Sequence, residues 1–372
     1  MRILVVSALE ASSQYAHAIN TVKMAEAFAR LGHQVSIVCK RSSGSKESED
    51  KLARLYGLSK SLKWIQLPRN LWRYPIDDHW RFALMAIPVI LKNRPDMVFT
   101  RNYIAPVLTS KLGIPTIAES HAHTDNRTAP FLKMIKATRG KSFRLLVTIS
   151  DYLSECYREL GVPPEKLLVL PDAVDLNLFA RPSTLPPNPY NEKKPIVAYI
   201  GHLYDYKGIP TIIETASLLP DIVFHLIGGW PEDVERQRAR VENKGLKNVV
   251  LHGLIQHSRI PPFLWHSDVL LLPPSLDHPS AKWTSPVKLG EYLASGTPIV
   301  ATSIPALLDW LSEEEVQFVK PDSPESMAEG ILKILDNPER GQMLSKNGIL
   351  KSQNLSYERR AERLLKLSGL GS

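Results

Sequence analysis

The chain has 372 residues, of which 44% are hydrophobic and 23% are charged, and its formal net charge is +8. This length exceeds what one hydrophobic core usually holds, so the sequence predicts two domains of ordinary size. The cysteines are Cys39 and Cys156, which excludes a disulfide scaffold and a cysteine-based zinc or iron-sulfur site.

The excess positive charge belongs to the N-terminal half. Residues 1–180 contain 25 lysines and arginines against 16 aspartates and glutamates, whereas residues 181–372 contain 21 against 22. Such a surface attracts anionic lipid, nucleic acid or an acidic small molecule, and an ordinary solvated surface is an equal alternative. Nucleic acid is not expected as a partner, because no known binding motif accompanies the charge.

The sequence does not predict a transmembrane helix. The longest apolar run, residues 82–91, has ten residues and contains Pro88, whereas a spanning helix needs about 20. Residues 1–7 are basic and then apolar, but they are too few for a signal-peptide core, and we expect a strand there. We therefore expect a cytoplasmic protein, with peripheral attachment to the inner face of the membrane as an option.

Short β-branched runs alternate with helical stretches along the chain. The runs are apolar without a period of two, which is typical of strands buried on both faces of a parallel sheet, so the fold class is α/β. The clearest helix covers residues 19–31 and ends before Gly32. In the first half we expect strands at 3–7, 35–39, 97–100, 115–118, 145–149 and 167–170.

A proline-dense stretch, residues 181–189, separates two series of elements, because it can neither continue a helix nor join the middle of a sheet. We expect a first domain of residues 1–180, onto which a C-terminal helix (356–372) packs back, and a second domain of residues 190–355. Ligands bind at the carboxyl ends of strands in open parallel sheets, so two doubly wound, Rossmann-like domains facing a central cleft are predicted. In the second half we expect strands at 196–200, 223–227, 249–252, 269–272, 298–301 and 317–319.

The common phosphate-binding loops are missing. Residues 7–20, after the first strand, contain no glycine, and no Walker lysine loop occurs, which disfavours dinucleotide dehydrogenases and the commonest ATPases and kinases. A different phosphate site is suggested by Gly201, at a strand end, and Lys207, before a helix. Glycine lets the backbone approach a ligand, and a lysine beside a helix N-terminus neutralises a diphosphate. An ordinary strand-loop-helix connection is the alternative.

Residues 285–302 form the most informative block, Ser-Pro-Val-Lys-Leu-Gly-Glu-Tyr-Leu-Ala-Ser-Gly-Thr-Pro-Ile-Val-Ala-Thr. Lys288 and Glu291 are charged residues on the first turns of an expected helix. A carboxylate at this position can accept both hydroxyl hydrogens of a ribose, and Ser285 with the helix N-terminus can face phosphate. A solvated helix face is the alternative, although the order of loop, charged helix, glycine turn and buried strand weakens it.

This block resembles that of the retaining, nucleotide-sugar-dependent glycosyltransferases of family four, also called glycosyl transferases group 1, which have the GT-B fold. The family's Gly-Arg-Leu-x3-Lys-Gly is similar to residues 201–208 and implies that Lys207 contacts the donor diphosphate, with His202 in place of the usual arginine. Its Glu-Ala-Met-Ala-x-Gly-x-Pro-Val-Val is similar to residues 291–300 and implies Glu291 as the ribose ligand. Trp283 stands where the family has a partner glutamate.

The resemblance covers nearly the whole chain. Residues 117–123 are similar to the family's Glu-x-His or His-Asp segment, which implies that His121, and secondarily His123, faces the donor sugar. Without the resemblance, a histidine beside a strand end is more often structural. Asp277 and His278 are candidate sugar contacts in place of the missing glutamate, with an ordinary polar loop as the alternative.

The resemblance implies an enzyme of the hexosyltransferase type, in which the nucleoside diphosphate departs while an acceptor hydroxyl attacks from the same side. No cofactor and no metal are expected. The catalytic candidates are His121 and Lys207, and the donor-binding candidates are Gly201, His202, Lys207, Ser285, Lys288 and Glu291.

The acceptor side is expected in the first domain, and a polysaccharide precursor or another glycan, a lipid-linked molecule or a small molecule would be the acceptor. Residues 131–144 mix hydrophobic with cationic residues, which suits an anionic membrane surface that presents such a lipid. An amphipathic helix packed on the sheet is an equal alternative.

Two other functions are compatible with these residues. A sugar-nucleotide 2-epimerase of the same fold would need no acceptor, and a non-catalytic relative acting as a binding or scaffold subunit would explain His202 and Trp283. The sequence specifies neither the donor sugar and its base nor the acceptor nor the oligomeric state.

Overall fold

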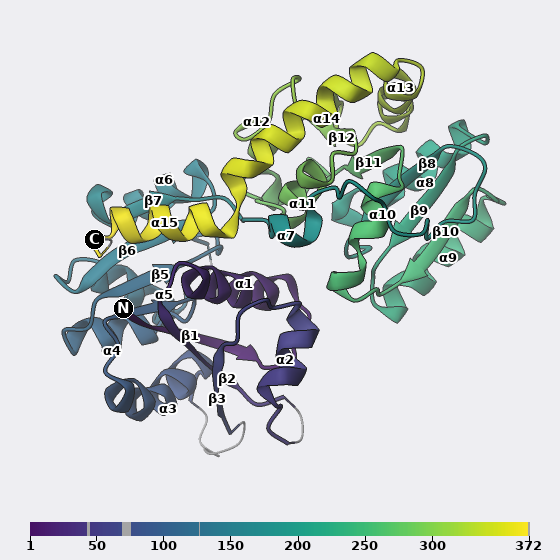
Figure 1. The fold of residues 1–372 in the computed structure, drawn as a ribbon. Helices are drawn as coiled ribbons and strands as arrows, with labels where there is room; N and C mark the ends of the chain where they lie inside the picture. The colour runs from purple at the N-terminus through teal and green to yellow at the C-terminus, as the bar shows by residue number, and fades with distance from the viewer. Residues whose placement is uncertain (43–44, 69–75, 126, 371–372) are drawn as a thin grey trace. The chain divides into compact units, whose positions relative to one another are not determined.

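The computed structural model describes residues 1–42, 45–68, 76–125 and 127–370. The chain forms two compact units (Figure 1). The first consists of Met1–Ala173 together with Tyr357–Ser372, and the second is the continuous segment Val174–Ser356.

Within the described residues, the first unit contains a seven-stranded sheet whose strand order is β3-β2-β1-β4-β5-β6-β7. Neighbouring strands pair in parallel throughout. The strands are β1 (Arg2–Glu10), β2 (Gln34–Lys40), β3 (Lys63–Leu67), β4 (Met97–Thr100), β5 (Thr116–Glu119), β6 (Phe143–Thr148) and β7 (Leu167–Val169).

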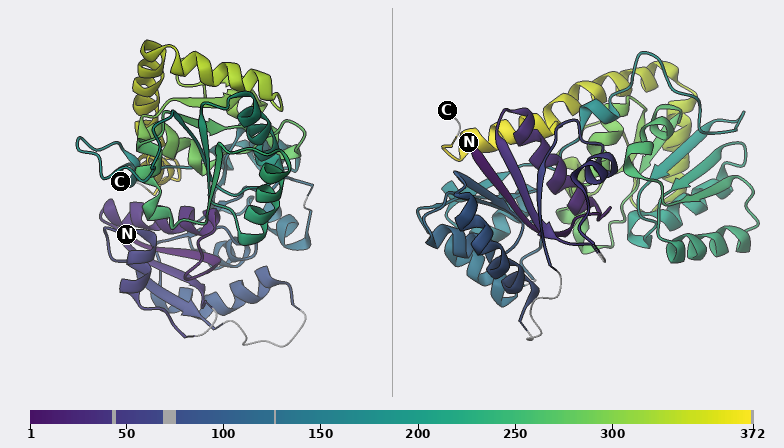
Figure 2. Two further views of the ribbon diagram at one scale, coloured as in Figure 1. Left: turned by 90° about the vertical axis from the view of Figure 1, so that its right-hand side faces the viewer. Right: turned by 60° about the horizontal axis from the view of Figure 1, so that its bottom comes forward.

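Helices cover both faces of this sheet (Figure 2). Ile3 and Val5 of β1 belong to a core shared with helices α1, α2 and α15, whereas Leu4 and Val6 belong to a core shared with α3 and α4. This alternation follows from the opposite directions of successive side chains in a strand. The helices are α1 (Ala16–Arg30), α2 (Glu49–Tyr56), α3 (Asp78–Asn93), α4 (Ala105–Lys111), α5 (Ala129–Ala137), α6 (Asp151–Glu159) and α15 (Tyr357–Leu367), with the short η1 (Pro164–Lys166).

The second unit contains, in its described residues, a six-stranded parallel sheet of order β10-β9-β8-β11-β12-β13. Its strands are β8 (Ile196–Ile200), β9 (Val223–Ile227), β10 (Val249–Gly253), β11 (Val269–Leu272), β12 (Ile299–Thr302) and β13 (Gln317–Val319).

One core of the second unit contains residues of α7, α10, α11 and α12, and the other contains residues of α8, α9, α13 and α14. These helices are α7 (Leu176–Phe179), α8 (Ile209–Leu218), α9 (Pro231–Asn243), α10 (Pro261–Trp265), α11 (Val287–Ser295), α12 (Pro305–Leu308), α13 (Pro324–Leu335) and α14 (Pro338–Ser352). Short 3-10 turns are η2 (Asp205–Lys207), η3 (His257–Arg259), η4 (Pro279–Lys282) and η5 (Gln353–Leu355).

The α/β class and the two doubly wound sheets predicted from the sequence are confirmed, and each of the twelve expected strands matches an observed one. The strand that the sequence did not predict is β3. Its residues Lys-Trp-Ile-Gln-Leu include an exposed lysine and a polar glutamine, and β3 pairs with β2 alone, at the edge of the sheet. An edge strand therefore lacks the continuous apolar run of a central parallel strand.

The boundary between the units lies at Val174 rather than within residues 181–189. The Val174 amide donates to the Leu355 carbonyl oxygen at 2.9 Å, and Val174 also pairs with Ser356 in an isolated bridge. The Phe179 side chain is fully buried in a core of the second unit. These contacts place residues 174–180 in the second unit, while α15 lies beside α1 in the first unit (Figure 1).

His225 in β9 and His252 in β10 share a hydrogen bond, with 2.8 Å between Nδ1 of His225 and Nε2 of His252. The His225 side chain is buried, and burial together with the neighbouring His252 lowers the pKa of His225 to about 4. The unfolded chain therefore binds a proton at His225 at a higher pH than the folded chain does. This difference makes folding less favourable as the pH falls from about 6.5 towards about 4.

We predict that His225 contributes about 2 kcal/mol to the loss of unfolding free energy between pH 7 and pH 5. Replacement by a non-titrating side chain, His225→Gln, should flatten this dependence in urea denaturation measured at both pH values. Burial also lowers the pKa of the partly exposed His33, which serves as the control: His33→Gln should flatten the dependence less than His225→Gln does. An equal pH dependence in the wild type and in His225→Gln would contradict the prediction.

Candidate functional site

The first candidate region lies in the second unit, where β8 ends at Gly201. Gly201 has a φ of 143°, and a Cβ atom at this position would lie 2.4 Å from Nζ of Lys288. Lys288 is on the first turn of α11, and its ammonium group stands 3.9 Å from the ring centre of Tyr199. Glycine is therefore needed for the close approach of the Lys288 ammonium group to the end of β8.

Lys207 is the second cation of this region. It ends η2, directly before α8, and its Nζ lies 5.0 Å from the ring centre of Tyr206. Burial lowers the pKa of Lys207, and burial and the charge of Lys207 lower the pKa of Lys288 well below its usual range. Among the described residues, neither ammonium group forms an ion pair or a hydrogen bond. Two cations that repel each other without a carboxylate partner indicate a site for an anion.

Two helix N-termini add to this positive region. Neither Gly208 before α8 nor Pro286 before α11 provides a side-chain hydrogen bond to its helix. Backbone N–H groups at such ends carry partial positive charge and bind anions. A Cβ atom at Gly208 would lie 1.8 Å from the Pro273 carbonyl oxygen, so glycine also lets the start of α8 pack against the segment after β11.

Four rings stack in series beside the lysines. His202 stacks on Tyr204 with ring centres 5.1 Å apart, Tyr204 on Tyr206 at 5.5 Å, and Tyr206 on His278 at 4.2 Å. Burial and the nearby Lys288 lower the pKa of His202, so His202 adds little positive charge at neutral pH. The expected donor residues Gly201, His202, Lys207 and Lys288 are therefore brought together.

His278 packs within its own loop as well as against Tyr206. Its Nδ1 lies 2.7 Å from Oγ of Ser280, and the Ser280 amide donates to the same nitrogen. Asp277 is exposed, and its amide donates to Oγ of Ser275. Ser285 precedes α11 and is half-buried.

Glu291 has a partner that the sequence did not reveal. Its carboxylate is buried, and Oε1 lies 2.6 Å from Nε2 of His257 in η3. Oε2 makes no hydrogen bond within the described residues and is the oxygen that a ribose hydroxyl could reach. No spacing signal links His257 to Glu291, because 34 residues separate them.

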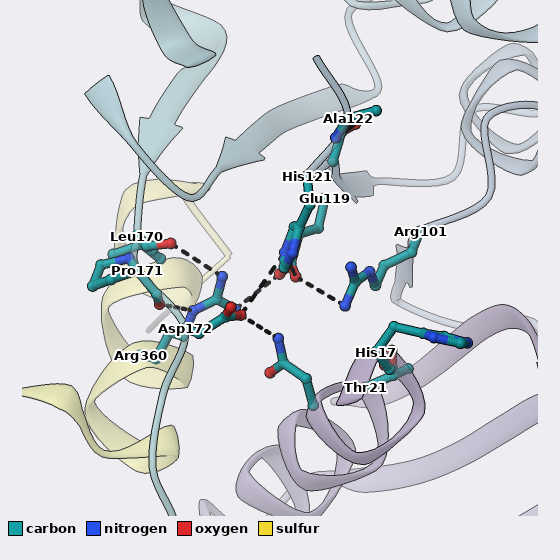
Figure 3. A network of polar contacts seen from close by, with 12 residues as sticks. His17, Thr21, Arg101, Glu119, His121, Ala122, Leu170, Pro171, Asp172 and Arg360 are labelled. Atoms are coloured by element: carbon teal, nitrogen blue, oxygen red, sulfur yellow. Dashed lines mark hydrogen bonds and ion pairs between the residues drawn. The ribbon is translucent and has the colours of Figure 1, made fainter. Parts of the chain in front are cut away.

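The second candidate region is a buried polar network in the first unit (Figure 3). Glu119 ends β5 and is buried, with Oε2 2.9 Å from Nη1 of Arg360 in α15. Arg360 also donates to the carbonyl oxygens of Pro171 and Leu170. Burial would raise the pKa of the Glu119 carboxyl group, but the charge of Arg360 and the hydrogen bond to His121 outweigh it and hold this pKa well below its usual range.

His121 is bound by this network. Its Nε2 lies 2.8 Å from Oε1 of Glu119 and 3.9 Å from Oδ1 of Asp172. Because Glu119 is ionised, Nε2 carries the hydrogen of this contact and the ring orientation is fixed. Asp172 in turn accepts a hydrogen bond from Nδ2 of Asn20 at 2.5 Å, and burial raises the pKa of Asp172.

His123 lies outside these contacts. Its Nδ1 is 3.0 Å from Oδ2 of Asp125, and its ring stacks on Tyr152. The structure thus joins His121, but not His123, to the buried carboxylates.

Most large apolar side chains of the segment 131–144 are buried, and Leu132 is the exposed one. Phe131, Met134 and Ile135 of α5 are buried, as in a helix packed on its sheet. The exposed residues of the segment are Leu132, Lys133, Lys136, Arg139 and Lys141.

Two family models together cover most of the chain. Residues 19–178 match Glycosyltransferase Family 4, and residues 181–351 match Glycosyl transferases group 1. The chain belongs to the family 4 glycosyltransferases with the GT-B fold. The family and enzyme class predicted from the sequence are confirmed, and the epimerase and scaffold alternatives are not favoured.

This glycosyltransferase is similar to the processive diacylglycerol alpha-glucosyltransferase of Acholeplasma laidlawii, with 26% identity over 46% of this chain and 52% of that protein. The chain thus spans about half the length of this relative. WcaL of Salmonella typhimurium, assigned to colanic acid biosynthesis as a glycosyltransferase, is 24% identical over 77% of this chain and 82% of its own. The fold is also that of the Anabaena protein HepE in complex with UDP and glucose, with a TM-score of 0.74, 14% identity and 98% of both chains covered.

In the part of the glycosyltransferase that the structure describes, no helix is both long and apolar enough to cross a membrane. The same residues contain no group of three or more His, Cys, Asp or Glu side chains placed to hold a metal ion.

The Arg360 to Glu119 ion pair yields a prediction for stability. Arg360→Met leaves Glu119 buried without its main counter-ion, so the free energy of unfolding should fall by about 3–5 kcal/mol in urea denaturation. Adding Glu119→Gln to Arg360→Met should restore part of this loss, because the unpaired charge is removed.

The exposed Arg363 on the same helix provides the matched control, and Arg363→Met should change the unfolding free energy by less than about 0.5 kcal/mol. Equal losses for Arg360→Met and Arg363→Met would contradict the importance of the buried pair.

Proposed function

We propose that the protein transfers a sugar from a uridine diphosphate sugar to an acceptor hydroxyl, with retention of the anomeric configuration. The observation that carries this proposal is the pair of lysines without a carboxylate partner, Lys207 and Lys288, at Gly201 and two uncapped helix N-termini. A diphosphate supplies the negative charge that this region lacks. HepE, which has this fold, binds UDP and glucose.

The second unit accordingly binds the donor, and each predicted residue has a part in the proposal. Lys207 and Lys288 hold the diphosphate, with Gly201, His202 and Ser285 lining the same region. Oε2 of Glu291 accepts from a ribose hydroxyl, while Oε1 stays on His257. Asp277, His278 and His123 are proposed as further sugar contacts.

The chemistry assigned to the lysines is stabilisation of the leaving group. When the bond between the anomeric carbon and the diphosphate breaks, further negative charge grows on the already anionic diphosphate, and two preoriented ammonium groups stabilise this added charge. In the first unit, His121 is proposed to contact the reacting sugar, its ring held by Glu119. No metal or other cofactor takes part in this proposal.

Retention is supported by the Acholeplasma relative, whose name specifies an alpha product. Its acceptor, diacylglycerol, is a lipid, and WcaL is assigned to a polysaccharide pathway. We therefore propose a lipid-linked or polysaccharide-precursor acceptor bound by the first unit. The exposed cations Lys133, Lys136, Arg139 and Lys141 would attach this unit to an anionic membrane surface by charge.

Calorimetric titration with UDP, GDP, ADP and their sugar conjugates tests the donor site. We expect saturable binding of one series, weakened at least tenfold in Lys207→Ala and in Lys288→Ala, because each loses a charge-assisted contact with the diphosphate. Lys244→Ala, which removes a lysine paired with Glu214 on the surface of the same unit, should bind normally. Absence of binding to every nucleotide at millimolar concentration would refute the donor assignment.

A second prediction concerns Gly201. Gly201→Ala forces the Lys288 side chain away, so donor binding should weaken at least tenfold. Gly245 also has a positive φ but has open space around its Cβ position, so Gly245→Ala should cost about 1 kcal/mol of stability and leave donor binding unchanged. Unchanged donor affinity in Gly201→Ala would show that the approach of Lys288 to Gly201 is not required.

A further inference from the structure

Arg101 has an unusual environment. It directly follows β4, and its side chain is only 16% exposed. Within the described residues its guanidinium group makes no hydrogen bond, and Nη1 is buried without a hydrogen-bond partner. A guanidinium group has five N–H donors, and to bury them unused is costly unless a ligand accepts from them.

The nearest carboxylate does not satisfy Arg101. Oε1 of Glu119 is 3.7 Å from Nη1 of Arg101, beyond hydrogen-bond distance. Both oxygens of Glu119 already have closer partners, Arg360 and His121 at 2.9 and 2.8 Å. Glu119 is therefore shared: Arg360 and His121 take its hydrogen bonds, and Arg101 has only the longer ion pair with it, so the N–H donors of Arg101 stay available for a ligand.

The position of Arg101 in the sheet suits ligand binding. After β1 the chain continues to β2 on one side, and after β4 it continues to β5 on the other side, so adjacent strands β1 and β4 form a topological switch point. Ligands of doubly wound sheets bind beyond the carboxyl ends of the strands at such a point. Figure 3 shows Arg101 between the Glu119 and His121 pair and His17 of α1. Burial and the charge of Arg101 lower the pKa of His17. His17 is therefore not a second cation that competes with Arg101 for an anion.

We propose that Arg101 binds an oxyanion of the acceptor, a phosphate or a carboxylate group. The planar guanidinium group offers two parallel N–H donors, which match either group. The identification of the ligand as the acceptor rests on the proposed transferase function, whereas the oxyanion site itself does not. The protein therefore selects acidic acceptors over neutral ones.

Thermal melting with inorganic phosphate or with acetate, at constant ionic strength set by chloride, tests the site. The full chain with Lys207→Ala and Lys288→Ala is the starting protein, so that phosphate binding at the donor lysines does not contribute. We expect phosphate or acetate to raise the melting temperature of this protein in a saturable way. The anion that raises it shows whether a phosphate or a carboxylate group is recognised. Adding Arg101→Gln should weaken this binding at least tenfold, whereas adding Arg158→Gln, a surface arginine paired with Glu155, should not.

A structural role for Arg101 predicts different results. Arg101→Met in chloride alone should melt no lower than the wild type if the arginine serves a ligand, because it removes a buried donor without a hydrogen bond while Glu119 keeps its two closer partners. A melting temperature lowered by several degrees, without any anion effect in the starting protein, would overturn the proposal. So would equal anion binding with and without Arg101→Gln.

UDP titration separates this proposal from the transferase assignment. Arg101→Gln should bind UDP as the wild type does, because Arg101 belongs to the first unit. If the wild type binds no nucleotide, the donor assignment fails, and loss of oxyanion binding in Arg101→Gln still supports the site.

Discussion

The ion pair between Arg360 and Glu119 is the constraint on which the first unit depends. A carboxylate at the end of β5 is ionised inside the protein, which is tolerable only because a guanidinium group and a histidine both contact it. Arg360 comes from α15, at the far end of the sequence, and its other donors bind two carbonyl oxygens just before Asp172. One buried pair therefore fixes the last helix, the end of a central strand and the orientation of His121.

The second unit handles its charges in the opposite way. Burial lowers the pKa of both Lys207 and Lys288, and the charge of Lys207 lowers that of Lys288 further; within the described residues both lie against aromatic rings and neither forms an ion pair. The backbone geometry at Gly201 and Gly208 maintains this arrangement, because any side chain there would clash with Lys288 or Pro273. Burying two lysines close together lowers the stability of this unit, and a ligand that neutralises their positive charge would remove that cost.

Buried central strands could be predicted from the sequence, and the proposed donor residues could be singled out, because both signals are local. The apolar runs of β8 and β11 are continuous, and Gly201, Lys207 and Glu291 occur within short characteristic blocks. The edge strand β3 has no such run. His257, Arg101 and Arg360 could not be predicted as site residues, because their partners lie 18 to 241 residues away and are set only by the packing of the sheet and its helices. The assignment of Val174 to the second unit is not visible in the sequence for a similar reason, since Val174 is placed by a contact with Leu355.

The discontinuous first unit has a consequence for synthesis on the ribosome. Ala361, Leu364 and Leu365 of α15 complete a core that also contains residues of β1 and α1, whereas the second unit is one unbroken segment. The second unit needs only its own segment to fold, whereas the first unit also needs α15, which is translated after the whole of the second unit. Until α15 is made, the α1 residues that it covers stay exposed. A stop codon before α15 would damage the domain that was translated first and spare the one that precedes the truncation.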